Sequence, residues 1–270
     1  MLLTVDPINK SYSSFPNPPV QVLHDVSFSL APGQALGLVG ESGSGKSTIA
    51  KCLMALAAPE SGSILYDGMD VSKARGAELL RFRREVQMVF QDPYGSLSPR
   101  MSVEELIGEG LLVHKLEPTA ARRRERVAEI MRTVGLNPDD MVRFPRSFSG
   151  GQRQRIAIAR ALVIGPRILV CDEPVAALDV SVQAQVINLL RDMQRKLGLA
   201  IVFIAHDLAV VRHLCDSIVV LHKGRVVEAG PRADIFERPR EAYTQALLAA
   251  VPVPDPEIGR PRRERRHVLT

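Results

Sequence analysis

Residues 40–47 read Gly-Glu-Ser-Gly-Ser-Gly-Lys-Ser, a glycine-rich run that ends in a lysine and a hydroxyl. Glycines let successive backbone N–H groups curl around phosphate oxygens, and a helix N-terminus behind them favours negative charge. We expect Lys46 to reach the β- and γ-phosphates and the Ser47 hydroxyl to coordinate Mg²⁺. The run predicts a nucleoside-triphosphate site made of Gly40, Ser42, Gly43, Ser44, Gly45, Lys46, Ser47 and Thr48.

Two adjacent acidic residues follow the apolar run at 168–171. Asp172 ends a predicted buried strand, where a carboxylate is costly unless something compensates its charge, so we expect it to hold the metal through water. Glu173 comes one residue later, where it can polarise an attacking water, and phosphoryl transfer needs little more from a protein than position and charge. Alone, this pair is more typical of a turn at a strand end, but the glycine-rich run favours the catalytic interpretation.

Other polar side chains follow predicted strands in the same way. His206 comes directly after the strand at 199–205 and Gln91 after the strand at 86–90. Both should emerge at the carboxyl edge of the sheet, where open α/β folds bind ligands. We expect His206 to contact the γ-phosphate and Gln91 to contact Mg²⁺ or the attacking water. Tyr12 precedes the first core strands and is placed either to stack on adenine or simply to pack.

A second segment suited to anions lies at Ser149-Gly150-Gly151-Gln152. A serine followed by glycines at the start of a helix presents a hydroxyl and unblocked backbone amides. The alternative is an ordinary N-cap, for which serine is a preferred residue. Because one bound nucleotide does not need two such segments, two chains facing head to tail could each lend this segment to the nucleotide of the other.

The remaining pattern predicts an α/β fold. Continuous apolar strands are typical of a parallel sheet covered on both faces, and a run of helices inside the strand–helix alternation indicates an inserted helical part. Lys223-Gly224 is a turn signal between two short strands and predicts a hairpin. Strands are expected at 22–30, 35–39, 86–90, 168–171, 199–205, 217–221 and 225–228, and helices at 48–56, 102–112, 119–134, 150–163, 181–197 and 208–215.

Composition narrows the class of protein. The chain has 270 residues, of which 46% are hydrophobic, but no apolar run approaches the roughly 20 residues of a membrane-spanning helix. No signal peptide is indicated either, so a cytosolic protein is expected. The net charge of +5 is dispersed and tryptophan is missing, which argues against nucleic acid as a partner. The three cysteines are expected to be buried thiols, namely Cys52, Cys171 and Cys215.

In sequence and order these motifs resemble the ATP-binding cassettes of the ABC family. Residues 40–47 are similar to its Walker A motif, Gln91 to the Q-loop, and residues 148–152 to the family signature. The resemblance extends to Walker B with its catalytic glutamate (170–173), the D-loop (177–179, which adds Asp179 to the nucleotide contacts), the switch histidine His206 and the aromatic-loop residue Tyr12.

The resemblance implies two nucleotide domains that close on two Mg²⁺·ATP and open after hydrolysis. It implies Glu173, His206, Gln91 and Lys46 as the catalytic residues, and Ser47, Gln91 and Asp172 around the metal. The implied fold is a P-loop NTPase core at 1–91 and 164–250 with a mixed sheet, an antiparallel N-terminal β part and a helical subdomain at about 92–163. These parts form one domain over 1–250. Residues 251–270, rich in proline and arginine, are expected to be a disordered tail or a contact to anionic lipids.

A narrower resemblance is carried by residues 90–100, 172–181 and 243–252. These segments are similar to the ATP-binding subunits of bacterial dipeptide, oligopeptide and nickel importers. That group implies transmembrane permease subunits, a second identical or homologous ATPase subunit and a solute-binding protein as partners, with the chain peripheral at the cytoplasmic face of the cell membrane. The alternatives are a nickel or metal-chelate importer, an ABC ATPase acting on nucleic acid or the ribosome, and a small-molecule P-loop kinase.

Overall fold

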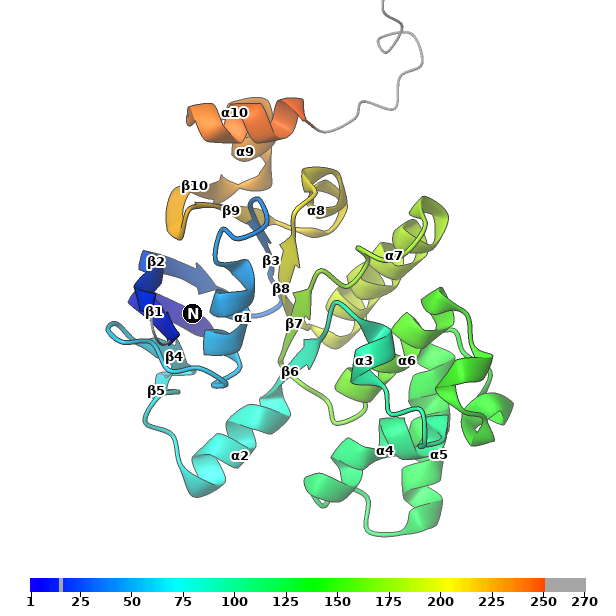
Figure 1. The fold of residues 1–270 in the computed structure, drawn as a ribbon. Coiled ribbons are helices and arrows are strands. Elements are labelled where there is room, and N and C mark those ends of the chain that lie inside the picture. The colour runs from blue at the N-terminus through cyan, green and yellow to red at the C-terminus, as the bar shows by residue number, and fades with distance from the viewer. Residues whose placement is uncertain (15–16, 251–270) are drawn as a thin grey trace, which may run out of the picture.

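The computed structural model describes residues 1–14 and 17–250, so the tail predicted at 251–270 lies outside the described residues. Its centre is a six-stranded sheet in the order β10-β9-β3-β8-β7-β6 (Figure 1). β10 runs antiparallel to β9 and the other neighbours pair in parallel, so the sheet is mixed, as predicted. The strands are β3 (Ala35–Val39), β6 (Val86–Val89), β7 (Ile168–Asp172), β8 (Ala200–Ala205), β9 (Ser217–His222) and β10 (Arg225–Pro231).

Both faces of this sheet are covered, which explains why its strands are continuously apolar. Along β7, Leu169 and Cys171 join one hydrophobic cluster, whereas Ile168 and Val170 join the other. The first cluster includes buried residues of α7 (Val180–Leu197), α8 (Leu208–Leu214) and the helices that follow β6. The second includes buried residues of the N-terminal strands and α1 (Lys46–Leu53). Cys52, Cys171 and Cys215 are buried free thiols, as predicted.

The N-terminal part is a four-stranded antiparallel sheet in the order β2-β1-β4-β5. The sequence pattern predicted the second half of β2 but missed β1. The reason is that the register between β1 and β2 shifts repeatedly, for example between Val5 and Ile8 and between Ile8 and Lys10, which breaks the alternation of apolar and polar residues. The strands are β1 (Leu3–Ser14), β2 (Asn17–Leu30), β4 (Ile64–Tyr66) and β5 (Met69–Asp70).

Helix α1 ends three residues before its predicted end at Leu56. Met54 is its C-cap and Ala55 has a left-handed φ of 54°, which stops the helix. The N–H of Leu56 then donates to the carbonyl of Lys51 at 2.9 Å, and the Leu56 side chain is exposed. Because Leu56 is apolar and lies at helical spacing from Leu53, the sequence pattern predicted one more helical turn than the backbone forms.

Helices fill the chain between β6 and β7, and Figure 1 shows them together on one side of the central sheet. Arg160 ties them to one another, because its guanidinium donates to the carbonyl of Ser96 at 2.8 Å and pairs with Glu109 at 3.0 Å. They are α3 (Pro93–Ser96), α4 (Val103–Val113), α5 (Ala120–Thr133), the 3₁₀ turns η1 (Pro138–Val142) and η2 (Pro145–Ser147), and α6 (Gly150–Leu162).

Three helices lie outside these groups: α2 (Gly76–Glu85), α9 (Arg232–Glu237) and α10 (Ala242–Ala249). Figure 1 shows α9 and α10 beside β10, at the end of the molecule away from α2. Within residues 1–14 and 17–250, every helix is too short or too polar to cross a membrane.

Candidate functional site

The glycine-rich run connects β3 to α1, which is the context that a phosphate-binding loop requires. Gly40 passes so close to β9 that a Cβ there would collide with the carbonyl oxygen of Leu221. Gly45 has a φ of +104°, a left-handed conformation that favours glycine, and it directly precedes the first helical residue, Lys46. Ser42 and Gly43 are exposed, whereas Ser44 is buried.

The Lys46 ammonium lies at the centre of the loop. Its Nζ donates to the carbonyl oxygens of Gly40 at 2.7 Å and Glu41 at 2.8 Å, and it lies 3.9 Å from Oε1 of Glu173. Only 5% of its surface is exposed. Burial lowers the pKa of Lys46 below its ordinary value, and the charges of Glu173, Asp172 and Glu41 oppose this effect only in part. A buried ammonium at the centre of a glycine-rich loop is suited to a polyanion.

Asp172 and Glu173 lie at the carboxyl end of β7. Oδ1 of Asp172 is buried and has no hydrogen-bond partner in the described chain. Burial, and then the charge of Glu173, raise the pKa of Asp172, while Lys46 and the Ser47 hydroxyl act in the opposite direction. Glu173 has a left-handed φ of 45°, a costly conformation for a residue with a side chain, and its N–H donates to the carbonyl of Ile204 at 3.0 Å.

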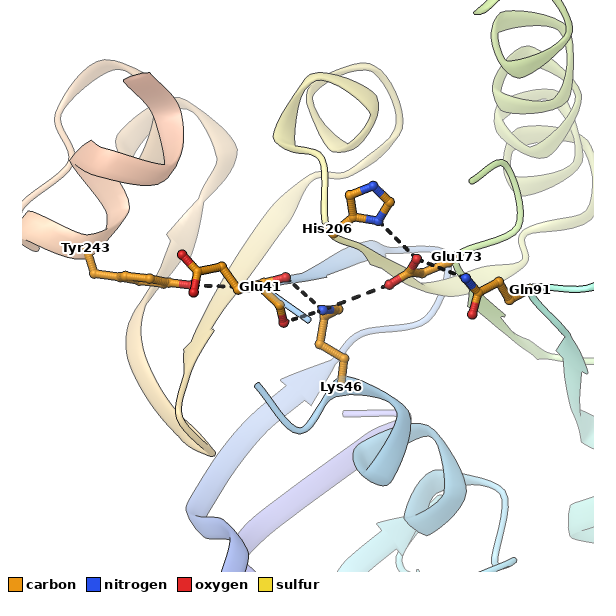
Figure 2. A network of polar contacts seen from close by, with 7 residues as sticks. Glu41, Lys46, Gln91, Glu173, His206 and Tyr243 are labelled. Carbon is orange, nitrogen blue, oxygen red and sulfur yellow. Dashed lines mark hydrogen bonds and ion pairs between the residues drawn. The ribbon is translucent and has the colours of Figure 1, made fainter. Parts of the chain in front are cut away.

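The other three predicted catalytic side chains meet at Glu173. Oε2 of Glu173 lies 3.0 Å from Nδ1 of His206 and accepts a hydrogen bond from Nε2 of Gln91 at 3.4 Å, while Oε1 faces Lys46 (Figure 2). These residues follow the neighbouring strands β6, β7 and β8 and the loop after β3. The carboxyl ends of parallel strands meet at one edge of a sheet, which is why residues more than a hundred positions apart in the chain come together.

The oxygen atoms here fit Mg²⁺. The Ser47 hydroxyl and the Asp172 carboxylate supply hard oxygen donors, and a cation bound nearby, directly or through water, would compensate the orphaned Oδ1 of Asp172. The Gln91 side chain beside Glu173 adds an amide oxygen. Among residues 1–14 and 17–250, no group of three or more His, Cys, Asp or Glu is placed to hold a metal. Mg²⁺ usually takes one or two carboxylates and completes its shell with phosphate oxygens and water.

The segment 149–152 begins α6. The Ser149 hydroxyl accepts from the N–H of Gln152 at 3.3 Å, and the Gln152 side chain accepts from the N–H of Ser149 at 3.0 Å, which makes a capping box. A Cβ at Gly151 would lie 2.5 Å from Val182 on α7, so packing requires a glycine there, and Gly150 is half-buried beside it. No hydrogen bond or ion pair within the described chain joins this segment to Glu173 or Lys46.

The other two predicted nucleotide contacts are surface residues. Asp179 is the N-cap of α7, and its carboxylate accepts from the N–H of Val182 at 3.0 Å and from the Ser181 hydroxyl at 2.7 Å. These hydrogen bonds lower the pKa of Asp179. Tyr12 lies on β1 with 41% of its surface exposed, and the ammonium of Lys10 lies 5.4 Å from its ring centroid.

One contact to the loop was not predicted. The Tyr243 hydroxyl, on α10, accepts a hydrogen bond from the N–H of Glu41 at 3.2 Å (Figure 2). The two residues are 202 positions apart, so no local pattern in the sequence could have joined them. Tyr243 stands in the segment 243–252, whose resemblance to importer subunits suggests no role for the tyrosine.

Comparison with known proteins agrees with this geometry. Residues 23–176 match the protein family described as "ABC transporter", and residues 227–268 match "Oligopeptide/dipeptide transporter, C-terminal region". The oligopeptide transport ATP-binding protein OppF of Bacillus subtilis is 46% identical over 96% of this chain and 85% of its own length.

Two solved structures have the same fold. The first is cbiO1 from Clostridium perfringens, part of the ABC transporter complex cbiONQ, with a TM-score of 0.78 and 30% identity over 88% of this chain and 92% of that one. The second is the ATP-binding cassette MJ0796, as a dimer in a post-hydrolysis state bound to ADP and phosphate. Its TM-score is 0.77 and its identity is 28%, over 85% of this chain and 98% of that one.

Proposed function

We propose that the chain powers the import of peptides through a separate membrane permease. The chain belongs to the ABC transporter family and is an ATPase of that family. The observation that carries the catalytic part is the convergence of Lys46, Gln91 and His206 on Glu173, beside a phosphate-binding loop. The match of residues 227–268 to the oligopeptide/dipeptide transporter region supports peptides as the cargo.

In this proposal the loop cradles the phosphates of ATP. Backbone amides between Gly40 and Thr48 bind the phosphate oxygens, and Lys46 leaves the loop carbonyls to pair with the β- and γ-phosphates. Tyr12 stacks on the adenine. Ser47, Asp172 and Gln91 are the residues that would hold Mg²⁺, which neutralises charge on the phosphates when it is bound.

Glu173 is the proposed general base. Its carboxylate is held between Lys46, Gln91 and His206, so it is already oriented toward the place where the terminal phosphate would meet Lys46. It takes a proton from the attacking water, and His206 and Gln91 then stay within reach of the γ-phosphate. Because all three contacts are to its two carboxylate oxygens, small movements of the loops after β6 and β8 can release Glu173 for that role.

The second half of each site comes from another subunit in this proposal. The hydroxyl of Ser149 and the amides of Gly150, Gly151 and Gln152 form an anion-binding helix tip that no described contact joins to the chain's own loop. We place this tip, together with Asp179, over the ATP of a second ATPase subunit, identical or homologous. The dimeric cassette MJ0796 bound to ADP and phosphate supports such an arrangement.

The remaining assignments describe the assembly. Residues 1–250 form the cassette, with a core at 1–91 and 164–250 and a helical subdomain at about 92–163. Its partners are transmembrane permease subunits and, indirectly, a solute-binding protein, which place it at the cytoplasmic face of the membrane. Nucleic acid is not among the proposed partners.

Glu173→Gln tests the catalytic assignment. The amide cannot accept a proton from water, so we expect ATP to bind while steady-state hydrolysis falls by at least about a hundredfold. ATP should then hold the dimer closed, which size-exclusion chromatography with and without ATP would detect. Phosphate release measures the turnover. Glu129→Gln is the matched control, because Glu129 pairs with Arg126 on the exposed face of α5. Near-normal hydrolysis by Glu173→Gln would exclude the proposed base.

A further inference from the structure

The nucleotide-binding loop rests against the C-terminal part of the chain. Tyr243 Oη accepts a hydrogen bond from the N–H of Glu41, and the carbonyl of Glu41 accepts one from the Lys46 ammonium at 2.8 Å (Figure 2). Glu41 is therefore held from both sides, by a tyrosine on its N–H and by the proposed phosphate-binding lysine on its carbonyl. A rotation of this residue would disturb both hydrogen bonds at once.

Tyr243 is itself fixed in place. Its ring lies against the ring of His222, with centroids 4.0 Å apart and planes inclined by 46°. His222 is the last residue of β9. Gly40 of the loop passes close to the carbonyl of Leu221, the preceding residue of this strand. Burial raises the pKa of Tyr243, so its hydroxyl is neutral throughout the physiological range. The hydroxyl is therefore a constant hydrogen-bond acceptor for the loop.

The helix that carries Tyr243 is anchored independently. The Glu228 carboxylate, on β10, accepts from the backbone N–H of Arg240 at 2.9 Å and of Glu241 at 3.2 Å. These bonds tie the turn before α10 to the sheet. Leu247 and Leu248 pack against the hydrophobic cluster on the α7–α8 side of the sheet. The position of the tyrosine thus depends on the docking of α10.

The β9–β10 turn holds the other end of the loop. The N–H of Gly224 donates to the carbonyl of Ser44 at 3.0 Å. Glu41 and Ser44 are consequently supported by two parts of the chain between residues 217 and 250. This arrangement fixes the loop residues on either side of Gly43, whose own surroundings are open.

The structure assigns Tyr243 as a positioning residue for ATP binding, through which the docking of α10 sets the affinity of the loop for nucleotide. The tyrosine does not touch the reacting atoms. It holds Glu41 so that the loop amides and Lys46 keep their orientation before ATP arrives, and a loop ordered in advance loses less entropy on binding. The inference rests on the proposed function, because it takes residues 40–47 as the ATP-binding loop.

Tyr243→Phe isolates the hydroxyl, because the ring and its contact with His222 remain. We expect ATP to bind about threefold to tenfold more weakly, the effect of losing one neutral hydrogen bond. The KM for ATP should rise accordingly, while kcat at saturating ATP stays within about twofold. Binding is measured with a fluorescent ATP analogue and turnover by phosphate release. A role confined to stability would instead lower the melting temperature and leave the affinity of the folded protein unchanged.

Tyr66→Phe is the matched control. The Tyr66 hydroxyl donates to Glu85 at 2.6 Å, and neither residue contacts the loop, so ATP affinity should not change. Glu228→Ala is the second variant, since it frees the turn before α10 without altering the tyrosine, and it should also weaken binding at least about threefold. Wild-type affinity in both folded Tyr243→Phe and Glu228→Ala would overturn the inference.

Lys46→Ala distinguishes a failure of the role proposed for Tyr243 from a failure of the proposed function. Loss of ATP binding in Lys46→Ala, combined with wild-type binding in Tyr243→Phe, would reject the role of Tyr243 and leave the proposed function standing. Full binding of ATP by Lys46→Ala would instead reject residues 40–47 as the ATP loop, and the inference would fall with it.

Discussion

At the scale of single residues, burial acts against both charges that the site needs. It lowers the pKa of Lys46 and raises the pKa of Asp172, so each group is less readily charged than it would be in water. A phosphate beside the lysine and a divalent cation beside the aspartate would reverse both effects. The site is therefore electrostatically suited to a metal–nucleotide complex, because such a complex brings both charges together.

The lowered pKa of Lys46 predicts how ATP affinity depends on pH. Only the charged ammonium attracts phosphate. As the pH is raised, the free protein should lose this proton, and ATP affinity should begin to fall, before the ordinary lysine value of 10.5 is reached. Once the lysine is mostly neutral, affinity should decline by up to about tenfold per pH unit. Titration of the fluorescent analogue between pH 7 and 11 measures it. Lys46→Arg should show a flatter curve, because a guanidinium stays charged. Constant wild-type affinity up to pH 10.5 would contradict the prediction.

At the scale of elements, two helices begin in the same way but only one is assigned a role. α6 and α4 each start with a serine in a capping box, and the serine hydroxyl accepts from the backbone at 3.3 Å in both. The cap alone therefore cannot distinguish an ordinary helix start from an anion site. What separates them is the pair of glycines after Ser149, which put no side chain beside the first amides of α6, whereas α4 has Val103 and Glu104 there.

Replacing each of these serines by alanine tests the difference. Ser149→Ala and Ser102→Ala should each cost about 0.5–2 kcal/mol of stability, because each removes an N-cap. Hydrolysis should fall at least about tenfold in Ser149→Ala only, since that hydroxyl is a proposed donor to the γ-phosphate. Urea denaturation and phosphate release measure the two effects. Equal turnover in the two variants would show that Ser149 is only a cap.

At the scale of the whole molecule, the proposed catalytic unit is larger than one chain. The loop and Glu173 lie at the carboxyl edge of the central sheet, whereas α6 lies with α4 and α5, across β6 and β7 from α1 (Figure 1). In the proposed head-to-tail dimer, the helix tip of one chain lies at the loop of the other. Each site would then need Lys46 from one subunit and Ser149 from its partner.

A mixing experiment tests this composition. Lys46→Ala and Ser149→Ala should each be nearly inactive alone, but a mixed dimer contains one site in which both residues are intact. Equal amounts form about half mixed dimers, so turnover should recover to about a quarter of the wild-type value. Phosphate release after subunit exchange measures it. Mixed dimers that form without any recovery would show that each chain builds its site from its own residues.

The sequence by itself determined the local chemistry of this protein. Glycine spacing, a strand followed by Asp172 and Glu173, and polar residues after two other apolar strands were enough to predict a phosphate loop and a shared sheet edge. The reason is that parallel strands present their carboxyl ends on one side whatever their order. Burial of the cysteines followed from their apolar surroundings in the same way.

Only the tertiary structure decided which segments meet. The strand order and the shifted register of β1 depend on pairings between distant parts of the chain. So does the hydrogen bond from Glu41 to Tyr243. A residue's neighbours in sequence report the period of its own helix or strand and the chemistry of its turns. They carry no information on which remote helix will dock beside it, because that choice depends on how the whole core is filled.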